Sequence, residues 1–203
     1  LAAKYGLDAF RYFLLRDMVF GLDSGFSEES LVRRLNADLA NDFGNLVSRS
    51  MAMAVKYLDG SLSAPDKLEE ADIGLKEAAL KVVEDYKGMM KAFAFNKALI
   101  VIWELIGRAN KYIDIMKPWV LAKSDRERLG TVLHTITEVI KMVSVLLWPF
   151  MPQTAEKIQH QLGLDRSGLE LTLDSLKEWG KTKQARPLSK GPPIFPRVKI
   201  DNT

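Results

Sequence analysis

The sequence has no cysteine and only two histidines, His134 and His160, among its 203 residues. Disulfides and thiolate-bound metals are therefore excluded, and a histidine metal cluster is disfavoured because the two residues lie far apart in the chain. No run of about eighteen apolar residues is present, and the first residues lack the pattern of a signal peptide. We therefore expect a cytoplasmic protein with no metal site and no membrane partner.

Neither sign of charge is in large excess. The 29 Lys and Arg residues nearly balance the 26 Asp and Glu residues, and the net charge is +3. This mild basic balance tolerates a polyanionic partner without requiring one. The hydrophobic fraction of 47% and the charged fraction of 27% are ordinary for a globular protein. The length suits one well-buried domain.

Strand-like alternation is not convincing anywhere, whereas apolar residues recur at helical spacing in five long stretches. The predicted helices cover residues 27–58, 71–92, 96–116, 125–148 and 152–162. Ser27 is a predicted N-cap, and Ser124 with Glu127 forms a predicted capping box. Proline and glycine exclude helix from residues 187–197. The predicted fold class is all-α, an antiparallel helix bundle with an extended C-terminal tail.

We expect three regions: a connector over residues 1–26 with a short helix and a turn, the bundle over residues 27–163, and an irregular tail over residues 164–203. The chain starts inside an apolar helix without an initiator methionine, so we expect a segment of a longer protein. Ile194 and Phe195 in the tail either dock back on the bundle or pack on a domain outside this chain.

The first long helix carries a polar stripe opposite its apolar face, formed by Arg34, Asp38, Asn41, Asn45 and Arg49. Asn offers a donor and an acceptor in one amide, and Arg offers a planar fork that also stacks, which suits unstacked RNA bases. Most such stripes are simply solvated, and Arg34 with Asp38 has the spacing of a surface ion pair. The spacing alone favours this ordinary explanation.

A second polar group lies at the end of the third long helix, where Asn110 and Asp114 are one turn apart. Pro118 then restricts the chain just before Trp119. A ring held at a helix end can act as a stacking platform for a base. The alternative is that Trp119 fills the core.

Five segments occur in the order and approximate spacing found in one enzyme family: YGLDAFRYFLL, DSGFSEESLVRRLNADLANDFGNLVSR, NKYIDIMKPWVLAK, LLWPFMPQTAEKI and IFPRV. Nearly the whole chain thereby resembles the C-terminal part of methionyl-tRNA synthetases. The opening helix and WPFMPQTA also resemble the class I synthetases for leucine, isoleucine, valine and cysteine. GNLVSR combined with NKYID and PW is similar to the methionine enzyme in particular.

The resemblance implies an anticodon-binding domain that recognises the CAU anticodon of methionine tRNA. Asn45, Arg49 and Trp119 match the family's anticodon-binding positions, and Asn41, Asn110, Asp114 and Pro118 fall on supporting positions. Asp114 cannot donate to a base edge, so we expect it to orient Arg49, Asn110 or Trp119. The expected partners are the anticodon stem-loop and the catalytic domain of the same chain, with no DNA and no membrane.

The family's HIGH-type motif and KMSKS-type loop do not occur in this sequence. We therefore expect no catalytic residue and no cofactor here, although the parent ligase uses ATP with Mg²⁺. Three alternatives remain open at this point. One is the equivalent domain of another class I synthetase, and a second is a helical bundle that binds a protein partner instead of RNA. The third is an enzyme with a site inside the bundle, for which Glu-x-x-His metal ligands would be expected, and that motif does not occur in the sequence.

Overall fold

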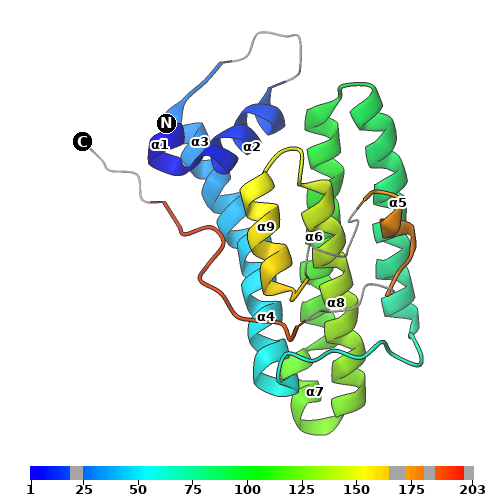
Figure 1. Cartoon of the computed structure of the whole chain (residues 1–203). Helices are drawn as coiled ribbons and strands as arrows, with labels where there is room; N and C mark the ends of the chain where they lie inside the picture. Colours follow the sequence, from blue (N-terminus) through cyan, green and yellow to red (C-terminus); the bar gives the residue numbers. More distant parts are fainter. Residues whose placement is uncertain (19–24, 165–171, 181–185, 199–203) are drawn as a thin grey trace.

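The structure is a computed structural model that describes residues 1–18, 25–164, 172–180 and 186–198 (Figure 1). All regular elements in these ranges are helical, which confirms the all-α prediction. Their bounds are α1 Ala2–Tyr5, α2 Leu7–Asp17, α3 Glu28–Arg34, η1 Leu35–Gly44, α4 Asn45–Leu58, α5 Glu70–Lys91, α6 Phe95–Met116, α7 Pro118–Ser124, α8 Arg126–Leu146, α9 Pro152–Gln161 and η2 Ser175–Lys177. Most of the predicted turn over residues 21–25 lies outside the described residues.

The long helices α4, α5, α6 and α8 pack around one apolar core, with α9 and α2 laid against them (Figure 1). Helix α8 lies at the centre and is long and apolar enough to cross a membrane by length and composition, but 89% of its apolar window is buried inside the protein. Fully buried side chains include Phe43 on η1, Tyr86 on α5 and Ile102 on α6. Burial of such side chains is the main stabilising contribution to a bundle of this kind.

The helix starts show one confirmed cap and one wrong one. Ser27 caps α3 by accepting a hydrogen bond from the backbone N–H of Ser30 at 3.1 Å, as predicted. Helix α8 is capped by Asp125, whose carboxylate accepts from the N–H of Arg128 at 2.9 Å, and not by Ser124. Ser124 is instead the last residue of α7, and its hydroxyl donates to the carbonyl of Val120 at 3.2 Å.

The predicted helix over residues 27–58 is continuous, but its middle third has π-helical hydrogen bonding over η1. In a π-helix each backbone carbonyl accepts a hydrogen bond from the N–H of the residue five positions later, so the helix is wider than an α-helix. At Gly44 the wider turn leaves no room for a side chain, because a Cβ there would lie 2.8 Å from the carbonyl oxygen of Leu39. Apolar periodicity alone does not reveal this change of helix type.

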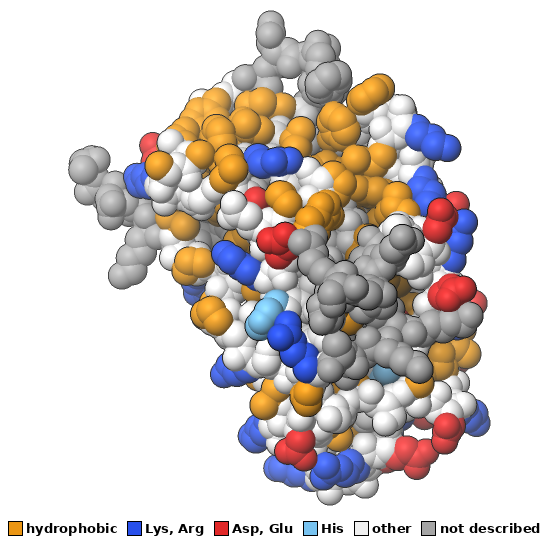
Figure 2. All heavy atoms as spheres, in the orientation of Figure 1, with side chains coloured by type: hydrophobic (Ala, Val, Ile, Leu, Met, Phe, Trp, Pro, Cys, Tyr) orange, Lys and Arg blue, Asp and Glu red, His pale blue; other side chains and the backbone are white. Residues whose placement is uncertain are grey.

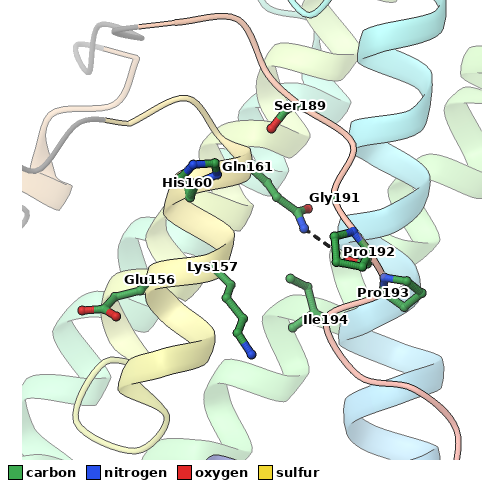
Figure 3. Close-up of a pocket in the computed structure, with 9 residues that line it drawn as sticks. All are labelled: Glu156, Lys157, His160, Gln161, Ser189, Gly191, Pro192, Pro193 and Ile194. Carbon is green, nitrogen blue, oxygen red and sulfur yellow. Dashed lines mark hydrogen bonds between the residues drawn. The ribbon is translucent and has the colours of Figure 1, made fainter.

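The C-terminal tail, here residues 186–198, runs back along the bundle between α9 and α4 (Figures 1 and 3). Leu188 donates its N–H to the carbonyl of Gly60 at 2.8 Å, and Ser189 donates to that of Gln161 at 2.9 Å. Ile194 and Phe195 are partly buried against the core, so the tail docks on the bundle. Beside these contacts, a mainly apolar hollow of about 510 Å³ lies between the tail and α9.

The two ends of the molecule differ in surface chemistry (Figure 2). Hydrophobic side chains gather around α1, α2 and the loop between α5 and α6, where Leu7, Phe26 and Phe93 are exposed. We call this region the apolar end. Charged side chains of both signs surround the opposite end near α7. The predicted site residues belong to η1, α4, α6 and α7.

Candidate anticodon-binding site

Helices α4 and α7 bring three predicted site residues onto one surface. Asn45 and Arg49 lie one turn apart on α4, and Trp119 lies in the first turn of α7. The Arg49 guanidinium carbon is 5.9 Å from the centre of the Trp119 ring, within the range of a cation–π contact. We call Asn45, Arg49 and Trp119 the α4–α7 site.

Asp114 orients the guanidinium of Arg49 from the neighbouring helix α6. The Arg49 Nη2 donates to Asp114 Oδ1 at 3.1 Å. Both side chains remain accessible, with 33% of Arg49 and 64% of Asp114 exposed, so the ion pair contributes little to stability. The contact instead fixes the direction in which Arg49 presents its remaining N–H groups.

Trp119 is displayed at the surface, with 40% of the residue exposed, and does not fill the core. Lys117 has a left-handed backbone at φ 48, and the buried Pro118 then occupies the first position of α7. Proline is favoured at this position because its ring presets φ and the missing N–H would have had no helical partner. The turn thereby rotates α7 away from α6 and holds the indole ring beside α4.

A buried ion pair joins α5 to α8 and lies against the end of α6. Asp72 on α5 is fully buried and accepts from Arg128 Nη1 at 2.6 Å and Nη2 at 2.9 Å, and from the hydroxyl of Tyr112. Arg128 also contacts the sulfur of Met116, the last residue of α6, at 3.3 Å. Burial alone would raise the pKa of Asp72, but the Arg128 and Tyr112 hydrogen bonds outweigh it and hold the pKa below its usual value.

The other two amide residues expected near the site have different contacts. Asn110 on α6 donates to the backbone carbonyl of Asp42 at 3.2 Å and so ties α6 to η1. Asn41 on η1 accepts from Arg197 Nη2 in the tail at 2.8 Å. The Asn110 side chain therefore holds the backbone of η1 at Asp42. Asn41 is exposed and lies beside the tail.

The expected surface pair between Arg34 and Asp38 forms at 3.2 Å, but it belongs to a larger cluster. Arg34 also pairs with Asp17 of α2 at 2.5 Å, and the Tyr12 hydroxyl of α2 donates to Asp38 at 2.6 Å. Burial, reinforced by the negative charge of Asp38, raises the pKa of Tyr12, so the phenol stays protonated. The cluster connects α2 firmly to η1.

Sequence reasoning did not assign a role to Ser48 or Arg197, which lie with Asn41 and Asn45 around a groove of about 520 Å³ between the tail and the helix. Arg197 belongs to the IFPRV segment, which the sequence comparison singled out. That segment has no helical or strand periodicity, so the sequence did not indicate where Arg197 lies. In the described part of the chain, no three His, Asp or Glu side chains gather as metal ligands would.

Two family descriptions match the chain. Residues 63–189 match the anticodon binding domain of methionyl tRNA ligase, and residues 1–51 match the class I tRNA synthetases of the methionine type. The relative from Caldanaerobacter subterraneus, named methionine–tRNA ligase, is 45% identical over 203 residues, which covers 99% of this chain and 31% of that protein. The methionine–tRNA ligase of Bacillus subtilis is 42% identical over 204 residues, 99% of this chain and 30% of that protein.

Solved structures agree with these matches. The apo methionyl-tRNA synthetase of Mycobacterium tuberculosis superposes with a TM-score of 0.90 at 36% identity, covering 98% of this chain and 40% of that one. The same enzyme with methionyl-adenylate gives a TM-score of 0.89 at 37% identity over 97% of this chain and 38% of that one. The chain thus spans less than half the length of these relatives, and it belongs to the methionyl-tRNA synthetase family, where it corresponds to the helical anticodon-binding region.

Proposed function

We propose that this chain binds the anticodon stem-loop of methionine tRNA and recognises its CAU anticodon through the α4–α7 site. The observation that carries the proposal is the placement of Arg49 between Asp114 and the exposed Trp119 ring, with Asn45 one turn away. This arrangement supplies a flat stacking surface next to oriented hydrogen-bond donors. Sequence-specific proteins use the same two elements to read unstacked RNA bases.

Cytosine suits this site better than uracil. The Watson–Crick edge of cytosine presents two acceptors, O2 and N3, next to its amino donor. The Arg49 guanidinium can donate to the acceptors, while the Asn45 amide oxygen can accept from the amino group. Uracil carries a proton on N3 and an oxygen in place of the amino group, so donors would face a donor and an acceptor would face an acceptor. Polar groups left unpaired in this way give strong discrimination.

The relatives are about three times as long as this chain, so they contain a further part that this chain can contact. We propose that the apolar end packs on the catalytic part that those proteins contain in addition, because exposed apolar patches commonly mark interfaces. ATP and Mg²⁺ would bind to that catalytic part, and no catalytic step is assigned to a residue of this chain. The proposed location is the cytoplasm.

The test is an NMR titration of this chain with two stem-loops that differ only at the first anticodon base, CAU and UAU, at low and stated salt. The titration detects binding up to millimolar RNA. We expect at least a ten-fold preference for CAU. Trp119→Ala should abolish most of the binding, because a stacked base is worth about 1–3 kcal/mol. Phe93→Ala, which removes an exposed aromatic ring at the apolar end, is the control and should bind like the original chain.

Equal binding of the two stem-loops would reduce the function to general RNA affinity and contradict the proposed recognition. No binding at millimolar RNA would favour the alternative of a bundle that binds a protein partner. The salt dependence should be clear in either titration where RNA binds, since contacts to phosphates release counterions.

A further inference from the structure

The hollow between α9 and the C-terminal tail shares no residue with the α4–α7 site (Figure 3). We call it the α9–tail pocket. Its lining residues come from α9 and from the tail: Glu156, Lys157, His160, Gln161, Ser189 and residues 191–194. The volume of about 510 Å³ and the mainly apolar lining are those of a small-ligand site, since such sites enclose about 300–1,000 Å³ and carry few polar groups.

Two hydrogen bonds and one close approach hold the tail wall of this pocket against α9. Ser189 donates its N–H to the carbonyl of Gln161 at 2.9 Å, and the Gln161 amide donates to the carbonyl of Pro192 at 3.4 Å. Between these contacts the tail comes so near that a Cβ at Gly191 would lie 2.3 Å from Gln161 Nε2. The pocket is therefore formed before any ligand arrives, which lowers the entropic cost of binding.

The tail wall offers apolar surface and few hydrogen-bonding groups. Pro192, Pro193 and Ile194 follow one another along it, and neither proline has a backbone N–H to donate. A ligand gains free energy here by removing its own apolar surface from water. An aromatic ring suits such a wall, because it buries a large apolar area and has few rotatable bonds to immobilise.

One positive charge enters the pocket from α9. Figure 3 shows the Lys157 side chain extending into the space beside the tail, whereas Glu156 points to the other side of α9. Lys157 is exposed and forms no ion pair with any carboxylate in the described part of the chain. Its methylene groups add apolar surface, while its ammonium group can bind an anion. The pocket therefore favours a ligand with an apolar body and one negative charge.

We propose that the α9–tail pocket binds a small aromatic carboxylate, with its ring against Pro192 and Ile194 and its carboxylate on Lys157. The inference goes beyond the proposed function and does not depend on RNA binding. It assigns a binding role to Lys157, which no other contact in the described residues explains. A ligand held between α9 and the tail stabilises the docked tail, because it binds only when both walls are in place.

The first test is an NMR titration of this chain with cinnamate, beside cinnamamide as the neutral ligand with the same ring. Chemical-shift changes should be confined to α9 and residues 188–194. We expect a dissociation constant of about 1 mM for cinnamate, the affinity of a ligand of this size. Cinnamamide should bind about three-fold more weakly, because it lacks the exposed ion pair with Lys157. Shift changes centred on the apolar end, or equal affinity for the two ligands, would overturn the inference.

The second test uses two variants that separate the charge from the apolar wall. Lys157→Met removes the ammonium group but keeps the length of the side chain, so cinnamate should bind as weakly as cinnamamide, whose affinity should not change. Pro192→Ala removes the ring from the wall but keeps the carbonyl that Gln161 contacts, so both ligands should bind more weakly by the same factor. Lys190→Met is the matched control, because Lys190 is an exposed lysine of the same tail and does not line the pocket.

The variants decide the inference in either direction. Lys190→Met should bind both ligands as the original chain does, and a loss of cinnamate affinity equal to that in Lys157→Met would reduce the effect to general charge attraction and overturn the inference. Unchanged binding in Pro192→Ala would overturn it too, because the ligand would then lie elsewhere. Both lysine variants replace exposed side chains and should unfold at the same urea concentration as the original chain. Lys157→Met should also keep the preference for the CAU stem-loop, so failure of one proposal leaves the other standing.

Discussion

Replacement of Asp72 by alanine should destabilise this protein far more than replacement of any surface aspartate. The Asp72 carboxylate accepts four hydrogen bonds: two from Arg128, one from Tyr112 and one from the backbone N–H of Glu69 at 2.8 Å. At about 1 kcal/mol net for each bond, the loss is roughly 4 kcal/mol. This agrees with the cost of about 3–5 kcal/mol when one partner of a buried ion pair is removed.

Urea unfolding followed by circular dichroism measures this difference, with Asp85→Ala as the matched control. Asp85 lies on the same helix and pairs with Lys81 at 2.5 Å, but the two side chains are 38% and 73% exposed. Exposed i,i+4 pairs contribute about 0.3–0.5 kcal/mol, so the control should unfold almost like the original chain. A loss below about 1.5 kcal/mol for Asp72→Ala would refute the argument.

A double replacement separates the lost attraction from the charge that is left behind. In Asp72→Ala the Arg128 guanidinium remains, with 11% of its side chain exposed, and among the described residues it keeps the 3.3 Å contact to Glu69 as its one ion pair. Asp72→Leu combined with Arg128→Met removes both charges and should therefore cost less than Asp72→Ala alone. A larger cost for the double replacement would contradict the view that the unpaired cation dominates.

The pH dependence has a definite sign. Because the folded-state pKa of Asp72 is lowered, its contribution to stability is present above the unfolded value of about 3.9 and is lost as the pH falls through the lower folded value. Unfolding free energy measured from pH 5 downward should therefore fall less steeply in Asp72→Asn than in the original chain. Parallel curves would show that another carboxyl group controls the acid transition.

Two further predictions concern packing and backbone. Phe43→Ala should lower the free energy of unfolding in urea by about 3–5 kcal/mol, because Phe43 is fully buried. Asn45→Ala and Trp119→Ala replace exposed residues and should leave this free energy nearly unchanged. Equal losses in all three variants would contradict the separation of core from site. Gly163→Ala should lower the melting temperature, since Gly163 has φ 68 and a Cβ would lie 2.0 Å from the carbonyl oxygen of Arg186. Gly130→Ala on α8 meets no atom within 4 Å and should raise it, so a rise for both would refute the steric argument.

Long helices were predictable from the sequence, since their apolar residues follow the helical period over several turns. The observed helices Glu70–Lys91 and Phe95–Met116 each start one residue earlier than expected, and the first also ends one residue earlier. Helix α7 was missed because seven residues between a proline and an aspartate give too short a pattern. That omission also produced the wrong cap at Ser124, since both Ser124 and Asp125 are capable cap residues.

The site was predictable in part. Spacing placed Asn41, Asn45 and Arg49 on one face, but only the resemblance connected them with Trp119, because two residues 70 positions apart share no local pattern. The docking of the tail depends on single contacts, such as the Asn36 amide on Val198, which leave no periodic signal. The placement of Arg197 beside Asn41 was therefore visible only in the structure.

The cluster at Tyr12, Arg34 and Asp38 has a mechanical consequence. The helix from α3 through η1 to α4 is continuous, so Asp38 and Arg49 sit on one rod, eleven residues or about 16 Å apart at the α-helical rise. The bonds from Tyr12 and Asp17 tie this rod to α2 at Arg34 and Asp38, where α3 meets η1. A ligand that tilts the rod at Arg49 must stretch these bonds or pull α2 along, and α2 belongs to the apolar end. The continuous helix thus joins the residues of the α4–α7 site to α2 through unbroken backbone and direct side-chain bonds.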